Sequence, residues 1–342
     1  MTKAKTALLE RPNGNGFRIN GSLQKRLLVI GGGTGSYNVL SGLKQHNCSL
    51  TAVVAMTDSG GSSGRLRDEF GHLPPGDLRQ CLLALSRDDH SSILLRQLFN
   101  FRFSRGNGLE GHSFGNLFLT ALTEITGSTE LAVIEAGRLL GIKGTVLPVT
   151  LTNSNLCARL AGGSEIVGEA NIDNRTEKPH EKIDYVYLSP KAFVYALTAQ
   201  AIEEADAVIM GPGDLYTSIV PNLLVDGVPE SIQKCKGKKI YVCNLMTKHG
   251  ESDGFKVSDF IKEIQQYLGS HGALDYVLVN SDPVPEKLVQ RYAREDSQPV
   301  EFDEEECRKL GPEIIQAPLL AVGNLVRHDA SNLAKAIFEA VS

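Results

Sequence analysis

LLVIGGGTGSYNVLSGLK, from Leu27 to Lys44, decides the fold of this chain. Its first four residues are apolar, which is enough for one buried strand. A glycine-rich turn follows, and apolar residues then recur at helical spacing. The residues of the turn are Gly31, Gly32, Gly33, Thr34 and Gly35, and the apolar residues after it are Val39, Leu40 and Leu43. Strand, glycine turn and helix in this order are typical of the start of a nucleotide-binding α/β domain.

This turn has the chemistry of a phosphate site. Glycines let the backbone approach a ligand closely, and the free N–H groups at a helix start favour an anion. The dinucleotide pattern G-x-G-x-x-G is incomplete, because Ser36 stands where the third glycine would be. A tight turn without a ligand is the alternative. Since the next strand also ends in a glycine-rich turn, we expect Gly32, Gly33, Thr34 and Gly35 to bind phosphate.

Two more predicted strands end in turns of the same kind. The strand at 50–56 leads into TDSGGSSG, in which Asp58 has the position of a ribose-binding acid. Gly60, Gly61, Ser62 and Ser63 offer N–H groups and hydroxyls to one anion, although a flexible surface loop is the alternative. The strand at 206–210 leads into GPGDLYTS. Because ligands bind at the carboxyl ends of parallel strands, we expect Gly33, Gly61 and Gly213 to line one cleft.

Four polar side chains near the second turn are further candidates. Arg67 is a solvated charge or a phosphate clamp. Asp77 either caps the helix at 78–85 or contacts a ligand or metal. His112 stands at the start of a helix among small polar residues, where a ligand contact competes with a structural role. Asn116 lies one turn later and can donate to a carbonyl or phosphate.

The composition narrows the class of protein. The 342 residues are 42% hydrophobic and carry a net charge of −5, so no basic excess suggests nucleic acid as a partner. No apolar run approaches the roughly 20 residues that a membrane span needs. The six cysteines form no CxxC pair, which favours reduced thiols in a cytoplasmic protein. We expect a flexible tail over 1–25, a single nucleotide-binding domain over 26–342, and a homo-oligomer, namely a dimer.

Periodicity and turn signals place the remaining elements. Helices are expected at 93–103, 130–140, 192–204, 257–268 and 330–341. Strands are expected at 146–150, 185–188, 239–245 and 276–280, and a hairpin at 155–169 turns at Gly162 and Gly163.

Read in order, several motifs resemble one known family. They are GGGTG, TDSGGSSGRLRDEFGHLPPGDLRQCLLALS, GHSFGNLFLTALTEITG, GPGDLYTSIVPNLLVDGV, YVCNLMTKHGESDGF and RHD. From Leu27 to the C-terminus, the chain resembles the gluconeogenesis factor proteins of the YvcK type, which belong to the CofD-like superfamily of 2-phospho-L-lactate transferase. The resemblance implies a Rossmann-like α/β fold, with a mostly parallel sheet, helices on both faces and the ligand over the strand ends.

The resemblance implies two kinds of activity. In the transferase branch, a phospholactyl or phosphoenolpyruvyl group moves from a guanylylated donor to a deazaflavin alcohol, assisted by Mg²⁺. The gluconeogenesis factor branch binds UDP-sugars such as UDP-N-acetylglucosamine and supports growth on gluconeogenic carbon sources and normal cell shape, without an established reaction. The motifs of this chain are closer to the second branch, which implies a regulatory protein partner.

The resemblance also assigns site residues. The third turn would flank the base or sugar, and Arg291 matches a basic ligand-binding position. Phe255 replaces a tyrosine that helps to bind the UDP-sugar, and Ser59 replaces the second acid of a pair. The remaining expected ligand-binding residues are Gly211, Gly213, Asp214, Thr217, Asn244, Met246 and Thr247.

Three functions remain open at this stage. The first is a UDP-sugar-binding regulator, whose ligand we expect to bind without metal because backbone N–H groups carry the phosphates. The second is a magnesium-assisted transferase, with Asp58 or Asp214 holding the metal. The third is NAD binding without catalysis, which Asp58 permits. Two converging carboxylates at the strand ends would favour the transferase, and one would favour a binder.

Overall fold

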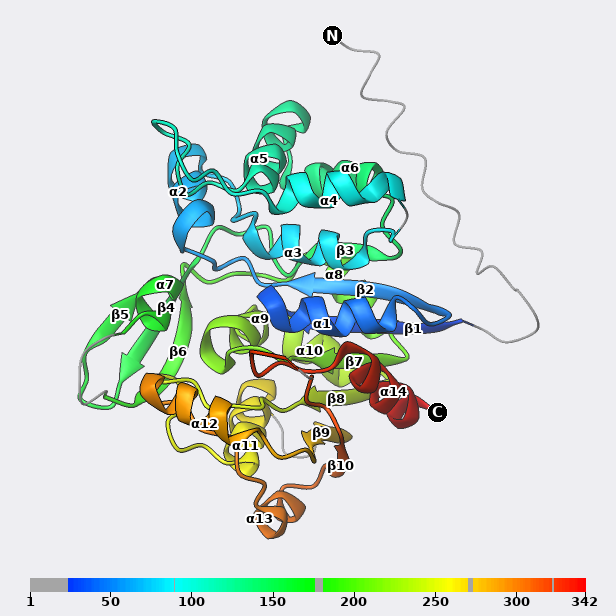
Figure 1. The fold of residues 1–342 in the computed structure, drawn as a ribbon, viewed down its shortest axis with the longest axis vertical. Helices are drawn as coiled ribbons and strands as arrows, with labels where there is room; N and C mark the ends of the chain where they lie inside the picture. The colour runs from blue at the N-terminus through cyan, green and yellow to red at the C-terminus, as the bar shows by residue number, and fades with distance from the viewer. Residues whose placement is uncertain (1–23, 89, 176–180, 270–272, 322) are drawn as a thin grey trace.

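A parallel sheet of seven strands forms the centre of the protein (Figure 1). The computed structural model describes residues 24–342 except 89, 176–180, 270–272 and 322. The strand order is β10-β9-β8-β7-β1-β2-β3, and each pair is parallel. The strands are β1 (Lys25–Gly31), β2 (Cys48–Val54), β3 (Thr145–Pro148), β7 (Ala207–Met210), β8 (Lys238–Val242), β9 (Tyr276–Asn280) and β10 (Glu313–Ala317).

The central strands are apolar because helices cover both faces of the sheet. Leu27–Ile30 and the whole of β7 are almost completely buried. Helices α1 (Gly33–Leu43), α3 (Gly76–Leu85) and α14 (Ala330–Val341) pack on one face. Helices α8 (Ala196–Glu203), α9 (Val220–Leu223), α10 (Val228–Lys234) and α11 (Val257–Leu268) pack on one another on the other side. The predicted Rossmann-like α/β class is confirmed.

The order of the strands defines where a ligand should lie. From β1 the chain runs outward through β2 to β3, and it later returns to β7 on the other side of β1. The strand order therefore reverses between β1 and β7. In open α/β sheets such a switch point leaves a crevice at the carboxyl ends of the strands.

A small antiparallel sheet lies beyond those carboxyl ends, at the left of Figure 1. Its order is β5-β4-β6, from β4 (Asn155–Leu160), β5 (Glu165–Val167) and β6 (Ile183–Ser189), and the short helix α7 (Glu169–Asp173) follows β5. Strands β4 and β5 form the predicted hairpin around Gly162 and Gly163. We call residues 155–189 the excursion. It brings α7 back to the edge of the large sheet.

The remaining helices complete the fold. Helices α4, α5 and α6 stack beyond α3, and α12 and α13 precede the last strand. Their bounds are α2 (Gly61–Phe70), α4 (His90–Asn100), α5 (Phe114–Thr126), α6 (Thr129–Leu140), η1, a π-helical turn (Leu215–Ile219), α12 (Glu286–Tyr292), η2 (Ala293–Glu295) and α13 (Glu304–Lys309). No described helix combines the length and apolar content that crossing a bilayer requires.

Several predicted bounds were wrong. The helix expected at 93–103 begins at His90 and ends at Asn100, and the helix expected at 192–204 begins only at Ala196. Its first residues are extended instead, because Phe193 and Val194 form bridges with Asp226 and Thr150. The strands expected at 146–150 and 239–245 end earlier, at Pro148 and Val242. Of the predicted tail, residues 1–23 lie outside the described residues, and Lys25 already belongs to β1.

Candidate functional site

Two adjoining cavities open at the switch point between β1 and β7. The inner cavity has a volume of about 320 Å³ and the outer one about 490 Å³. Five residues line both cavities, which therefore form one continuous cleft. They are Thr34, Gly35, Asp173, Gly213 and Asp214. Both volumes lie in the range of small-molecule sites.

The first glycine turn forms the floor of this cleft. Gly33 begins α1 with a φ of +59°, in the left-handed region that favours glycine. Gly35 packs against the third turn so closely that a Cβ there would lie 1.9 Å from the Pro212 carbonyl oxygen. The first N–H groups of α1 have no partner within the helix, so they can bind an anion in the cleft.

Carboxylates dominate the inner cavity. Five of them line it, namely Asp58, Asp77, Glu169, Asp173 and Asp214. Burial and the charge of Asp58 raise the pKa of Asp77 to about 7. Burial, with the charges of Asp58, Asp173 and Asp77, also raises the pKa of Glu169 to about 8. Asp77 and Glu169 therefore retain protons near neutral pH, because the other carboxylates make the inner cavity strongly negative.

Asp77 does not cap its helix, so that interpretation was wrong. Helix α3 begins at Gly76, after Pro75, and no side chain caps it. Asp77 lies in the first turn, and its carboxyl group faces the glycine turn of β1. A Cβ on Gly32 would lie 2.1 Å from Asp77 Oδ2. The chain therefore brings Asp77 next to Asp58, which meets the condition of two converging acids.

A buried glutamate organises the third turn. Glu251 accepts hydrogen bonds from the Tyr216 backbone N–H (2.9 Å) and from the Thr217 hydroxyl (2.9 Å). It thereby satisfies donors at the start of η1. Burial and the charge of Asp214 raise the pKa of Glu251 to about 7. On the other side of the turn, Asn244 donates to the Gly213 carbonyl (2.8 Å).

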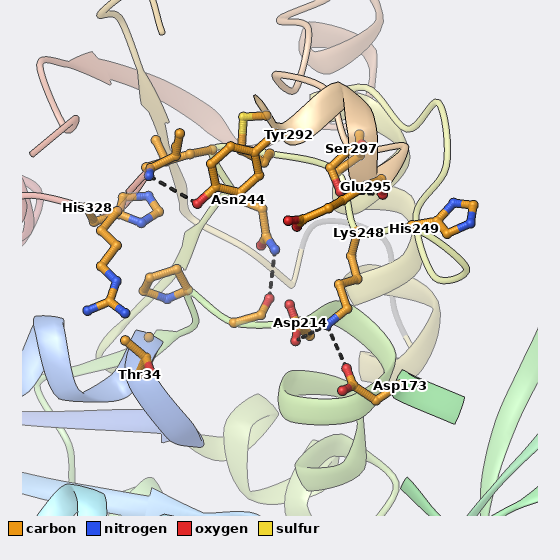
Figure 2. Close-up of a pocket in the computed structure, with 18 of the residues that line it drawn as sticks. Thr34, Asp173, Asp214, Asn244, Lys248, His249, Tyr292, Glu295, Ser297 and His328 are labelled. Atoms are coloured by element: carbon orange, nitrogen blue, oxygen red, sulfur yellow. Dashed lines mark hydrogen bonds and ion pairs between the residues drawn. The ribbon is translucent and has the colours of Figure 1, made fainter. Parts of the chain in front are cut away.

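The outer cavity carries cations as well as acids (Figure 2). The Lys248 ammonium donates to Asp173 (2.6 Å) and Asp214 (3.1 Å). Arg327 and His328 line the same cavity. Burial lowers the pKa of His328 to about 4, so the imidazole is neutral, and its Nε2 lies 3.2 Å from the Cys243 carbonyl oxygen. Arg175, Lys248 and Arg327 therefore supply the positive charge of this cavity.

We expected the glycines of the second turn to line the cleft, and they do not. Among the described residues, Gly33 and Gly213 line the cleft, whereas Gly60, Gly61, Ser62 and Ser63 line neither cavity. Gly61 is exposed at the start of α2. Of this turn, Thr57 and Asp58 line the inner cavity, and Asp58 Oδ1 accepts from the Gly60 N–H (2.9 Å).

The two serines of this turn belong to a buried network between α2 and α5. The Ser62 hydroxyl lies 3.1 Å from His112 Nδ1, and Ser63 accepts from Asn116 (3.2 Å). Asn116 in turn accepts from Arg79 (2.9 Å). His112 and Asn116 therefore lie behind the turn, and the structure does not bring them to the cleft. Arg67 lies outside the cavities too, beside Asp68 (3.4 Å).

The predicted residues of the C-terminal half divide into two groups. Asn244, Met246 and Thr247 line the outer cavity, and Thr217 lines the inner one. Phe255 lines a separate cavity behind Glu251 and packs edge-to-face on Phe260. Gly211, the first residue of the third turn, is buried with a φ of +80° and lines neither cavity of the cleft. Arg291 donates to the Asn324 carbonyl (3.1 Å), and its neighbour Tyr292 lines the outer cavity instead.

Sequence reasoning missed several residues of the cleft. Glu169 and Asp173 lie in the excursion, after β5 and Gly168, and nothing in the sequence indicates that this segment returns to the large sheet. Lys248 and His328 lie in stretches whose motifs carried the resemblance, TKHG and RHD, so that signal was present in the sequence. The missed residues are Asn38, Thr57, Glu169, Asp173, Arg175, Pro212, Ser218, Leu245, Lys248, His249, Tyr292, Glu295, Ser297, Val326, Arg327 and His328.

The fit of a magnesium ion differs between two groups of acids. Asp58 and Asp77 offer two carboxylates, and no described lysine or arginine hydrogen bonds to either of them, so they fit an ion that also binds ligand phosphates. Asp173, Asp214 and Glu251 have carboxylate oxygens within 4.8 Å of one another. There, however, Lys248 already supplies the cation. A metal thus fits the first group and does not fit the second.

The fold and the cleft define a Rossmann-like protein with a small-molecule site at the switch point of a parallel sheet. The family model described as 2-phospho-L-lactate transferase CofD matches residues 27–320. The chain is 40% identical over 316 residues to the gluconeogenesis factor of Bacillus subtilis, covering 92% of this chain and 97% of that protein. It is also 40% identical over 314 residues to the gluconeogenesis factor of Listeria innocua, covering 91% and 94%.

A solved structure agrees with these relatives. The crystal structure of a protein from Bacillus halodurans superposes with a TM-score of 0.87 at 40% identity, covering 92% of this chain and 99% of that one. The chain belongs to the CofD family, among the members named gluconeogenesis factors. The predicted family is therefore confirmed.

Proposed function

We propose that the cleft binds a nucleotide-sugar, a UDP-sugar such as UDP-N-acetylglucosamine, and that the chain is a regulator of carbon metabolism and cell shape. The observation that carries this proposal is the position of the first turn. The open N-terminus of α1 lines both cavities at the switch point, where parallel sheets bind nucleotides. The diphosphate lies against Thr34 and Gly35, where the two cavities meet.

Charge orients the ligand within the cleft. The phosphates lie toward the outer cavity, because Lys248 and Arg327 supply positive charge there. The sugar lies in the inner cavity, because carboxyl groups in either protonation state form hydrogen bonds with hydroxyl groups, whereas the ionised ones repel phosphate. Asp58 and Asp77 therefore contribute to the recognition of the sugar rather than of the nucleotide.

Calorimetry with UDP and UDP-N-acetylglucosamine tests this arrangement. Asp58→Asn should weaken binding of the nucleotide-sugar about tenfold, equivalent to about 1.4 kcal/mol, and change binding of UDP little. Asp68→Asn is a matched control, because Asp68 is an exposed carboxylate of α2 outside both cavities. Absence of binding by the wild-type chain to UDP, UDP-N-acetylglucosamine, GDP, GTP and NAD, with and without Mg²⁺, would contradict the proposal.

The pair Asp58 and Asp77 favours a second function, a magnesium-assisted transferase. An ion held by these carboxylates and the phosphates of a guanylylated donor would neutralise charge on the transferred group. Side chains of the inner cavity would then orient the acid group of the donor. This alternative predicts ligand binding that requires the metal, whereas the regulator binds its nucleotide-sugar in EDTA. NAD binding without catalysis has no further support from the cleft, because four further acids line the same cavity as Asp58, the predicted ribose-binding acid.

Mass spectrometry distinguishes the regulator from the transferase. The wild-type chain is incubated with a guanylylated phospholactate donor, a deazaflavin alcohol and Mg²⁺. The regulator forms no product. Product that appears at an enzyme-like rate and disappears in Asp58→Asn would establish the transferase.

A further inference from the structure

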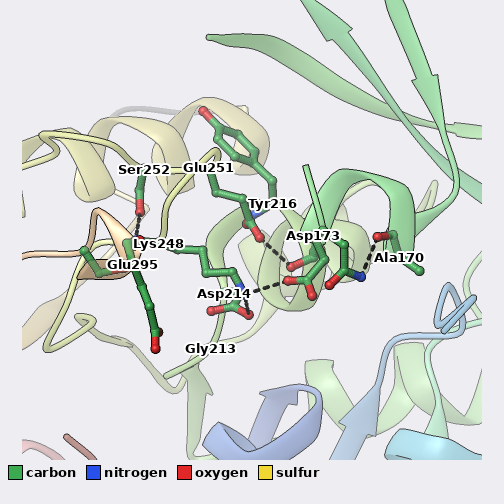
Figure 3. Close-up of polar contacts among 12 residues, drawn as sticks. Ala170, Asp173, Gly213, Asp214, Tyr216, Lys248, Glu251, Ser252 and Glu295 are labelled. Carbon is green, nitrogen blue, oxygen red and sulfur yellow. Dashed lines mark hydrogen bonds and ion pairs between the residues drawn. The ribbon is translucent and has the colours of Figure 1, made fainter. Parts of the chain in front are cut away.

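A lysine occupies the centre of an acidic group at the junction of the two cavities. Figure 3 shows Lys248 reaching between Asp173 of α7 and Asp214 of the third turn, with Glu251 beside them. The ammonium lies 2.6 Å from Asp173 Oδ1 and 3.1 Å from Asp214 Oδ2. The three acids come from three different segments of the chain, and Lys248 bridges two of those segments.

The spacing of the three carboxylates is that of a divalent cation site. Their oxygens lie within 4.8 Å of one another. Oxygen ligands surround Ca²⁺ at about 2.3–2.6 Å and Mg²⁺ at about 2.0–2.1 Å, so oxygens on opposite sides of an ion are roughly 4–5 Å apart. The group therefore has the size of a metal site, but its positive charge comes from the chain itself.

Each of the three acids already has a partner in this arrangement. Glu251 uses both oxygens to hold the start of η1, through the Tyr216 N–H and the Thr217 hydroxyl. Asp173 and Asp214 receive N–H donors from Lys248. These two carboxylates raise the pKa of the lysine, so it remains protonated across the physiological range. An ammonium has three donors, and these acceptors use two of them.

We propose that the Lys248 ammonium takes the place of a divalent cation among Asp173, Asp214 and Glu251. It joins the excursion to the third turn and excludes metal from this group of acids. The inference deepens the proposed function, since it assigns metal-independent binding to this part of the same cleft. It makes Lys248 a positioning residue that keeps Asp173 and Asp214 together. Through its remaining donor, it is also a contact for ligand phosphate.

Removal of the lysine charge should therefore create a metal site. Lys248→Gln keeps an amide that can donate to the carboxylates, and Lys248→Met keeps the chain length without a donor. We measure binding of Mn²⁺ by calorimetry to the full chain without nucleotide. Each variant should bind one more Mn²⁺ than the wild type and should gain a metal-dependent increase in melting temperature. Lys248→Arg retains the charge and should bind as many ions as the wild type.

A second substitution locates the new ion. In Lys248→Gln/Asp214→Asn the number of bound Mn²⁺ ions should return to the wild-type value. Ions held by Asp58 and Asp77 do not affect this comparison, because they are present in all these proteins. If Lys248→Gln binds no additional ion, or if the additional ion persists without Asp214, the inference is wrong. Because the experiment contains no nucleotide, failure of the proposed function leaves its result unchanged.

Discussion

Gly35 is the residue at which the first and third turns of the cleft touch. It lies within α1, where alanine is intrinsically more favourable than glycine by about 1 kcal/mol. The contact reverses this preference, because a Cβ would lie 1.9 Å from the Pro212 carbonyl oxygen and 2.6 Å from its carbon. Neither backbone atom can move without shifting the third turn. The packing therefore requires glycine here.

We predict that Gly35→Ala destabilises the protein by about 1–3 kcal/mol, the usual cost of overpacking, and weakens ligand binding. The clash moves the Pro212–Asp214 backbone away from the phosphate position. Thermal melting and calorimetry measure the two effects. Gly323→Ala is the control, because a Cβ on Gly323 meets no atom within 4 Å. Equal melting temperatures for the two variants would contradict the prediction.

Glu169 should make stability depend on pH. Burial and the charge of Asp58 raise its pKa from the ordinary value of 4.5 to about 8 in the folded state, so the folded protein retains a proton that the unfolded chain releases between these values. Stability should therefore fall as the pH rises from about 4.5 to 8 and become constant above 8. The largest slope from one proton is about 1.4 kcal/mol per pH unit.

Urea unfolding at pH 5, 7 and 9 tests this dependence. Glu169→Gln should reduce the loss of stability between pH 5 and 8, and Asp77, whose pKa is about 7, accounts for part of the remaining loss. Glu165→Gln removes an exposed carboxylate of the same excursion and should keep the wild-type slope. An unchanged slope in Glu169→Gln would show that Glu169 releases its proton equally in both states.

At the scale of elements, α7 depends on a contact from the second turn. The Ser59 hydroxyl accepts a hydrogen bond from the Ala170 backbone N–H (3.0 Å), and the Ser59 N–H donates to Glu169 (3.4 Å). Ser59 stands where the resemblance led us to expect a second acid. In this chain it fastens the excursion to the large sheet. Ser59 therefore has a structural role through these hydrogen bonds, and it does not supply the negative charge of the expected acid.

Ser59→Ala should lower the free energy of unfolding by about 1 kcal/mol, the usual effect of losing a helix-start acceptor. Amide hydrogens at the start of α7 should exchange faster, since the helix is short and its first turn loses this acceptor. Ser164→Ala removes an exposed hydroxyl of the same excursion and should change stability by less than about 0.5 kcal/mol. Unchanged exchange at Ala170 in Ser59→Ala would disprove the role of this contact.

Local sequence patterns predicted the elements well because their signals are short-ranged. The apolar runs and glycine turns of β1, β2 and β7 correctly gave the buried strands that surround the cleft. Errors arose where distant segments decide the conformation. Ala192 and the residues after it have helical composition, but bridges to Thr150 and Asp226 hold Phe193 and Val194 extended.

The acids of the cleft were predicted only in part, for a similar reason. Asp58 and Asp214 follow strands directly, so their position at the sheet edge could be inferred. Asp77 was predicted only as one of two alternatives, and it reaches the cleft because α3 begins one residue before it. Asp173 was missed, and it reaches the cleft because the excursion folds back. Both placements depend on tertiary packing. No spacing in the sequence contains that information.

At the scale of the molecule, the cleft joins two halves of the sheet. The β1–β3 half contributes the open N-terminus of α1 and the acids Asp58 and Asp77, and the β7–β10 half contributes the third turn and Lys248. The excursion adds Glu169 and Asp173 from a third direction. A ligand that occupies both cavities must contact all three parts.

Hydrogen exchange with and without UDP-N-acetylglucosamine tests this geometry. The first N–H groups of α1 have no partner within the helix and exchange fast, so a bound diphosphate should slow exchange at 34–36. At a ligand concentration 100 times its Kd, the added stability is about 2.7 kcal/mol, which corresponds to roughly 100-fold slower exchange. Amides at 169–173 and 213–218 should be protected in the same experiment.

The opposite edge of the sheet supplies the control for that experiment. A cavity of about 560 Å³ lies there, lined by residues that include Lys44, His46 and Lys143. It is larger than either cavity of the cleft, but it lies at the amino ends of the strands, where no helix N-terminus follows a strand. Exchange at 44–50 should therefore stay unchanged. Protection confined to 44–50 would place the ligand in the cavity at the amino ends of the strands and contradict the proposed site. Protection of 34–36 without 169–173 would show that the excursion does not take part in binding.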